Sequence, residues 1–178
     1  FGGVYASFVA SPSEGVSGAS RVLGTAVEYS MGRLYAGAGY HDLERASNGL
    51  KDREYAFGVG YGVGAFDFKG NYLVADPAGA DNKFEQFNLG VSFGFGSGRL
   101  LANLQQNRIE GGAKGTALAT TYSHELSKRT NLYASYARLS NNASGSFGIS
   151  SSGTSVAPGA SSPGADPSVL AVGVRHRF

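Results

Sequence analysis

The sequence of 178 residues contains no cysteine and no tryptophan, and only 16% of its residues are charged. The absence of cysteine excludes a disulfide framework and every metal site built from thiolates. An ordinary soluble domain is about one quarter charged, so this chain has an unusual composition for its length. The pattern of a conventional hydrophobic core is weak, and the fold must be inferred from periodicity instead.

Long apolar runs and clusters of positive charge are also missing. No apolar run approaches the length of about 18 residues that a membrane-spanning helix needs. The formal net charge is only +2, and lysine and arginine do not occur in runs, so we expect no nucleic-acid partner. The chain has no starting methionine and no secretory signal, and we expect it to be processed or to be part of a longer protein.

Glycine and aromatic residues are abundant, with 28 glycines, 10 tyrosines and 11 phenylalanines. This composition fits either a soluble β protein or a barrel whose apolar face points outward to lipid. The segment REYAFGVGYG shows the pattern that decides between them. Tyr55, Phe57 and Val59 fall on one face of an extended chain, and Glu54 and Ala56 fall on the other.

Ten segments carry this alternation, each about as long as the 9–11 residues of a tilted strand that crosses a bilayer. They are residues 2–10, 21–30, 33–41, 53–62, 65–74, 83–95, 98–107, 116–126, 130–139 and 168–178. Tight turns and longer polar loops alternate between them, which is typical of outer-membrane barrels. We therefore expect an all-β fold, an antiparallel transmembrane β-barrel or barrel portion in which residues 1–178 form a single domain.

The longest connection, residues 141–166, is rich in glycine, serine and alanine, and we expect it to be a flexible extracellular loop. The alternative fold is a soluble sandwich or lipocalin-like barrel, in which one face packs a core. The small residues on the polar faces favour a wide lumen over a packed interior. Aromatic residues near the strand ends also favour the membrane, because they resemble interfacial girdles. These aromatic residues are Tyr29, Tyr40, Tyr55, Tyr61, Phe66, Phe95, Tyr122 and Tyr136.

Two motifs near the end of the chain, at residues 126–130 and at the last four residues, resemble motifs of the Gram-negative general porins. Residues 126–130 read Leu-Ser-Lys-Arg-Thr and precede Leu132 and Tyr133, and in that family the same turn precedes a Leu-Tyr strand. The chain closes on Arg-His-Arg-Phe, similar to the Arg-His-x-Phe ending of the family, and its opening FGG resembles a strand start after a periplasmic turn.

The resemblance implies a multi-pass protein of the Gram-negative outer membrane, in contact with lipids and lipopolysaccharide and assembled as a homotrimer. Family members are sixteen-stranded and about twice as long, so these strands would match the last ten. A missing N-terminal portion or a second chain would then complete the barrel. The other interpretation is a smaller, complete barrel, since ten strands are an even number.

The final strand has a distinct role in the family. Its alternating face carries Leu170, Val172, Val174, His176 and Phe178. The resemblance implies that these residues form an assembly signal for the barrel insertion machinery, with the ring of Phe178 at the periplasmic interface. The alternative is that Phe178 is only an interfacial anchor.

Catalytic and metal-binding patterns are weak. The three histidines lie far apart in the sequence and lack the spacing of metal ligands, so we expect no metal and no cofactor. His41 and Asp42 form the only adjacent pair that an outer-membrane hydrolase would use at the rim of a barrel. We expect His41 to be a solvated rim residue and the protein not to be an enzyme.

These patterns predict a porin, a channel through which small hydrophilic solutes and ions diffuse passively. The alternatives are a non-conducting structural or adhesive barrel and an outer-membrane hydrolase. The alternation predicts the pore-lining residues Arg33, Glu54, Asp67, Lys69, Arg99, Glu125, Arg175 and Arg177, with Glu28 as a further acid. Five cations against four acids suggest a mild anion preference, unless the arginines pair with Glu28, Asp67 and Glu125 and leave the pore unselective.

Overall fold

The computed structural model describes residues 3–11, 20–79, 82–151, 154–156 and 162–178. Twelve strands form within these ranges. They are β1 (Val4–Ser11), β2 (Arg21–Met31), β3 (Leu34–Glu44), β4 (Lys51–Val63), β5 (Phe66–Asp76), β6 (Phe84–Phe95), β7 (Gly98–Ile109), β8 (Lys114–Ser127), β9 (Thr130–Asn141), β10 (Ile149–Ser151), β11 (Thr154–Val156) and β12 (Ser168–His176). Among the described residues, no helix is long and apolar enough to span a membrane.

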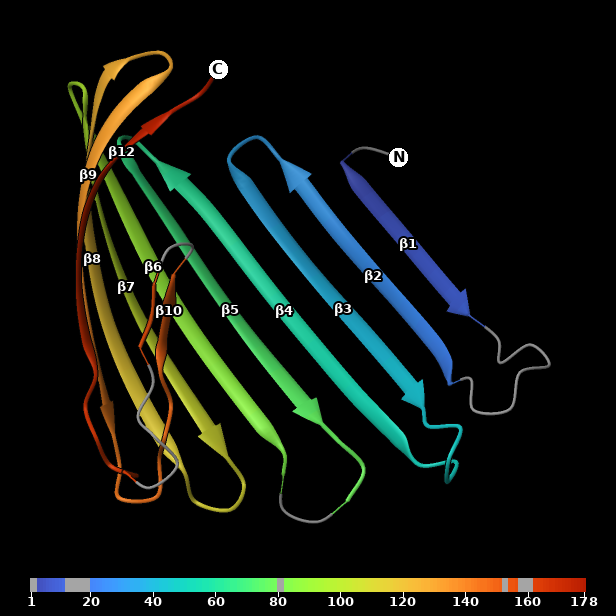
Figure 1. The fold of residues 1–178 in the computed structure, drawn as a ribbon. Helices are drawn as coiled ribbons and strands as arrows, with labels where there is room; N and C mark the ends of the chain where they lie inside the picture. The colour runs from blue at the N-terminus through green and yellow to red at the C-terminus, as the bar shows by residue number, and fades with distance from the viewer. Residues whose placement is uncertain (1–2, 12–19, 80–81, 152–153, 157–161) are drawn as a thin grey trace.

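Ten of the strands form one antiparallel sheet, in the order β1 to β9 followed by β12. The expected ten strands and the all-β antiparallel fold are thus confirmed. Figure 1 shows a curved wall in which β1 begins and β12 ends at the end that carries the short turns. The strands β1 and β12 are the two edges of this wall and do not pair with each other, so the described residues form an open sheet.

The long connection between β9 and β12 contains the two additional strands, which pair with each other as a short hairpin. This hairpin lies inside the loop expected at residues 141–166. The flexibility of that loop stays a prediction.

The short turns follow local backbone chemistry. Gly32, Gly64 and Gly96 have φ angles of 59°, 57° and 54°, in the left-handed region that glycine adopts without a steric penalty. The turn between β8 and β9 has no glycine, and a side chain stabilises it instead. The Ser127 hydroxyl accepts hydrogen bonds from the backbone N–H groups of Arg129 and Thr130, at 3.2 and 3.1 Å.

The strand register separates two faces across the whole sheet. Residues paired on neighbouring antiparallel strands point to the same side. Phe57 pairs with Tyr72, which pairs with Phe87, so large apolar residues follow one another across three strands. On the opposite side, Asn71 pairs with Asn88. The sheet thus has one apolar face and one polar face, as the alternation predicted.

The apolar face has no protein layer over it among the described residues. Phe57 is 55% exposed and Leu170 is 75% exposed, and in the part of the chain that the structure describes only Val74 and Leu139 are buried hydrophobic residues. A soluble sandwich would bury such a face against a second sheet about 10 Å away. An uncovered apolar face of this size fits contact with lipid instead.

Aromatic rings form a continuous row on the apolar face near the short turns. Phe66 stacks on Phe93 with centroids 4.6 Å apart, Phe93 lies 5.5 Å from Phe95, and Phe95 lies 6.1 Å from Tyr122. At the long-loop end, Tyr40 and Tyr55 pair at 5.3 Å. Five of the predicted aromatic residues therefore lie at the two ends of the apolar face, whereas Tyr136 lies in the middle of β9.

Candidate functional site

The polar face of the sheet borders two hollows. One hollow of about 350 Å³ is lined by Glu28, Tyr35 and Gln86, among others. A second hollow of about 320 Å³ is lined by polar side chains such as Lys69 and Asn103, together with small and apolar neighbours such as Gly90 and Leu101. Small and polar side chains thus bound open space on this side, which is the arrangement that an aqueous lumen needs.

The structure places all eight predicted pore-lining residues on or beside this face. Six lie in strands at polar-face positions, namely Glu54, Asp67, Lys69, Arg99, Glu125 and Arg175. Arg33 occupies a short turn, and Arg177 follows the end of β12. Their contact with a pore remains a prediction.

Asp67 brings together two of the predicted arginines. Its carboxylate lies 3.5 Å from the Arg33 guanidinium and 3.2 Å from that of Arg99, and Arg99 also donates to the Ser92 hydroxyl at 3.0 Å. Gly62 makes room for this arrangement, because a Cβ there would lie 2.5 Å from Nε of Arg33. Two positive groups and one negative group therefore form a network on the wall, as the pairing alternative expected for Asp67.

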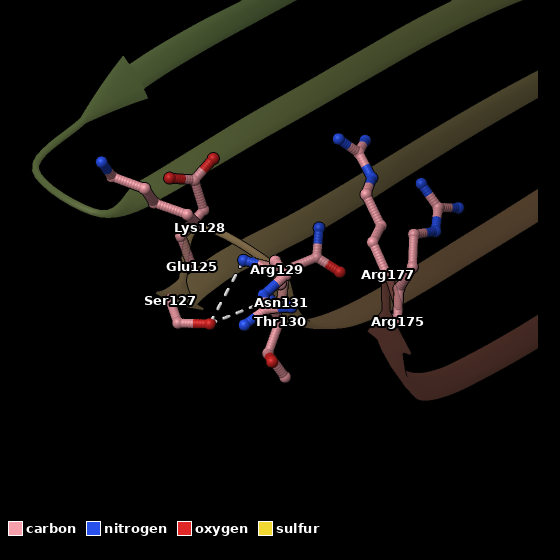
Figure 2. A pocket seen from close by; sticks show the side chains of 8 residues that line it. All are labelled: Glu125, Ser127, Lys128, Arg129, Thr130, Asn131, Arg175 and Arg177. Atoms are coloured by element: carbon pink, nitrogen blue, oxygen red, sulfur yellow. Dashed lines mark hydrogen bonds between the residues drawn. The ribbon is translucent and has the colours of Figure 1, made fainter.

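A second group of basic side chains surrounds the turn between β8 and β9. Among the described residues, these side chains have no paired carboxylate of the kind that Asp67 provides for Arg33 and Arg99. Lys128, Arg129, Arg175 and Arg177 line a pocket of about 70 Å³, and Glu125 is its one acidic side chain. Figure 2 shows these side chains around the turn. Within the described residues, none of the four cations lies within 4.0 Å of a carboxylate oxygen. We call this group the basic mouth cluster.

The backbone holds the basic mouth cluster together. Arg175 stands opposite Asn131 in the register, Asn131 stands opposite Glu125, and the N–H of Arg177 donates to the carbonyl of Arg129 at 2.9 Å. The final strand and the β8–β9 turn therefore meet at the short-turn end of the polar face. Strand alternation did not identify Lys128 and Arg129, because they lie in a turn, but the adjacent basic pair was visible in the sequence.

The candidate hydrolase pair does not form a dyad. His41 and Asp42 are consecutive residues of β3 and point to opposite faces. His41 lies 4.0 Å from Glu54 on the polar face, whereas Asp42 contacts Arg53 at 3.7 Å and accepts a hydrogen bond from Tyr40 at 3.3 Å on the apolar face. Strand geometry thus keeps the imidazole and the Asp42 carboxylate apart.

Comparison with known proteins agrees with this architecture. The outer membrane porin protein 32 of Delftia acidovorans is 32% identical over 167 residues, which cover 89% of this chain and 46% of the relative. The solved anion-selective porin from Comamonas acidovorans superimposes with a TM-score of 0.84 at 27% identity, covering 100% of this chain and 57% of that protein. The chain thus spans about half the length of these relatives.

A more distant neighbour shares the fold alone. The outer-membrane-expressed OmpT of Vibrio cholerae has a TM-score of 0.67 at 12% identity and covers 98% of this chain and 61% of that protein. At the level of the family, the Gram-negative porin model matches residues 1–144. The chain therefore belongs to the Gram-negative porin family and is an outer-membrane protein.

Proposed function

We propose that this chain supplies ten strands to the wall of a water-filled channel through which small hydrophilic solutes and ions diffuse passively. The observation that carries the proposal is the two-faced sheet, with a hollowed polar face and an apolar face that no other described residue covers as a second layer. Lipid and lipopolysaccharide would cover the apolar face, and water would fill the polar side. No bond is made or broken in this process, and the role is not enzymatic.

The two open edges support a larger assembly. An unpaired edge strand exposes backbone N–H and C=O groups, which cannot remain unsatisfied inside a bilayer. We therefore propose that further strands, from a preceding segment or a second chain, join β1 to β12. The family resemblance suggests a sixteen-stranded barrel and a homotrimer.

The basic mouth cluster supports a mild anion preference. It has four positive side chains and one negative side chain, whereas the network around Asp67 has two positive side chains and one negative side chain. Charges on a narrow channel wall are screened less than charges on an open surface. The solved relative from Comamonas acidovorans is named an anion-selective porin, which agrees with this direction.

Planar bilayers containing the complete protein test both claims. We expect stepwise ohmic openings and, across a KCl gradient, a reversal potential of the anion-selective sign. The Arg175→Gln/Arg177→Gln variant should shift that potential toward cation selectivity, more at 0.1 M KCl than at 1 M, because the Debye length falls from about 10 Å to about 3 Å.

The matched control is Arg21→Gln, because Arg21 lies on the apolar side of β2 and pairs with Glu44 at 3.0 Å. This variant should leave the potential unchanged. A protein without openings would contradict the channel. Openings with cation selectivity, or a potential that the double variant does not move, would contradict the role of the basic mouth cluster.

A further inference from the structure

A transverse row of paired residues crosses the polar face from β2 to β5. The register pairs Glu28 of β2 with Gly37 of β3. Gly37 pairs in turn with Gly58 of β4, and Gly58 pairs with Asn71 of β5. Neighbouring strands lie about 4.8 Å apart, so three strand spacings separate Glu28 from Asn71 by about 14 Å. Because the two glycines have no side chains, the row is low in its centre and raised at both ends.

The next polar-face row toward the long loops has a similar profile. Gly39 and Ala56 pair in its middle, and it ends on Gln86 of β6. The two rows together bound the hollow of about 350 Å³, which Glu28 and Gln86 line from opposite sides. Clefts that bind small molecules have volumes of about 300–1,000 Å³, so this hollow has room for one small ring.

Tyr35 adds an aromatic group on the Glu28 side of the hollow. A Cβ placed on Gly37 would lie 3.1 Å from the Tyr35 hydroxyl oxygen and 3.6 Å from Cγ of Glu28. The phenol therefore extends over Gly37 beside Glu28, and Tyr35 is 43% exposed. This side of the hollow thus combines an apolar ring, a hydroxyl group and a carboxylate.

The polar groups around the hollow are not paired with one another. Among the described residues, the side chains of Glu28, Asn71 and Gln86 make no hydrogen bond or ion pair. Elsewhere on the wall polar groups do pair, as Asn103 does by donating to the Asn88 carboxamide. The groups at the hollow therefore keep their hydrogen-bonding capacity for water or for a solute.

This capacity indicates the class of solute. A carboxamide both donates and accepts, whereas the Glu28 carboxylate only accepts. Sugar hydroxyls also donate and accept, so a ring with several hydroxyls matches both sides of the hollow, and its C–H groups suit the Tyr35 ring. Among the described residues that line the hollow, none is lysine or arginine, so an anion would meet Glu28 without a cation to bind it.

Asn71 also lines the second hollow of about 320 Å³, together with Asn88 and Asn103. The two hollows therefore adjoin at one carboxamide. A solute of two linked rings has room on both sides of Asn71 and meets further carboxamides in the second hollow.

We propose that the hollow between Glu28 and Asn71, lined also by Tyr35 and Gln86, is a binding site for neutral saccharides on the channel wall. The sugar exchanges its bound water for the two carboxamides, the carboxylate and the phenol. Binding is weak and saturates in the millimolar range, because each neutral hydrogen bond only replaces one made to water. The inference rests on the proposed channel function and adds a preferred class of solute to it.

Block of the ion current tests the site. In planar bilayers containing the complete protein, maltose should reduce the open-channel conductance in a saturable way, beyond the linear loss that the lower bulk conductivity causes. Gly58→Val should abolish the saturable part. A Cβ there meets only the Gly70 carbonyl oxygen, at 3.9 Å, so the wall accepts the new side chain, which fills the centre of the hollow. Asn71→Leu keeps the size of the side chain but removes its hydrogen bonds, and should raise the half-saturating concentration about tenfold.

The matched control is Thr121→Val, a substitution of nearly the same size on the polar face of β8 and outside both hollows. It should be blocked by maltose as the wild type is. Openings without saturable block, or equal block of the wild type and Gly58→Val, would overturn the site and leave the channel intact. Block by choline but not by maltose would assign the hollow to ammonium cations and would also overturn the proposal. A silent wild-type protein would instead overturn the channel function itself.

Discussion

Several glycines of the polar face lie beneath larger side chains. The Tyr133 ring covers Gly173 of the final strand so closely that a Cβ there would lie 2.6–2.9 Å from three atoms of the Tyr133 phenol. Gly62 accommodates Arg33 in the same way. These glycines therefore let aromatic and basic side chains lie flat against the wall, where they take little space from the lumen.

This contact predicts a position-dependent cost of substitution. Gly173→Val should lower the free energy of unfolding by about 1–3 kcal/mol, because the new side chain must displace the Tyr133 ring. Gly58→Val is the control, since a Cβ at Gly58 meets only one atom within 4 Å, at 3.9 Å. Urea unfolding of the complete protein in lipid vesicles measures both. If both variants lose the same free energy of unfolding, the close contact between Gly173 and the Tyr133 ring does not contribute to the cost of substitution.

The loop between β9 and β12 is an element whose anchoring depends on charge. The Asp166 carboxylate accepts from the Asn141 backbone N–H at 2.9 Å and from the Ser140 hydroxyl at 3.0 Å, and it lies 3.5 Å from Arg138. These contacts, led by the hydrogen bond from Asn141, hold the pKa of Asp166 below its ordinary value. The ionised carboxylate is therefore the form that the folded loop favours.

The sign of this shift gives a pH prediction. A lowered pKa means that the stabilisation by Asp166 is complete above the ordinary aspartate pKa of about 3.9, and is lost as pH falls through the lowered value. We expect hydrogen exchange at the Asn141 amide to be protected near neutral pH and to lose protection in strong acid. Asp166→Asn should be less protected at neutral pH and should lack the acid transition. If the variant and wild type share one pH profile, another group holds the loop.

At the scale of the molecule, the final strand is the most exposed apolar edge of the sheet. Leu170, Val172 and Val174 are 75%, 74% and 65% exposed, and Phe178 is fully exposed, with its ring centroid 4.9 Å from that of His176. The predicted alternation of this strand is therefore present on its apolar face. We propose that this face acts as an assembly signal before it is covered.

Deleting Phe178 should therefore reduce the amount of protein in the outer membrane much more than its small folded-state contacts suggest. Phe178→Tyr is the control, because it keeps an aromatic ring at the same place and should assemble at close to the normal yield. Quantification of folded protein in isolated outer membranes measures both. If the deletion variant reaches the outer membrane at normal yield, Phe178 is not part of an assembly signal and acts only as an interfacial anchor.

The sequence by itself determined the two faces of the sheet and the places of its turns. Tyr55 and Phe57 share a face because side chains of a strand alternate, and Gly64 marks a turn because of its backbone freedom, and both are local properties. The same alternation separates His41 from Asp42, which adjacency in the sequence had suggested as a pair. The same two-residue alternation also predicted that the pore-lining residues within strands lie on the polar face.

Only the tertiary structure decided which of those residues meet. Asp67 binds Arg33 and Arg99, which are 34 and 32 positions away, while Arg175 and Arg177 have no acidic partner among the described residues. Phe147, from a segment without periodicity, covers Gly115. Such contacts depend on the register of several strands and the curvature of the sheet, which no local pattern encodes.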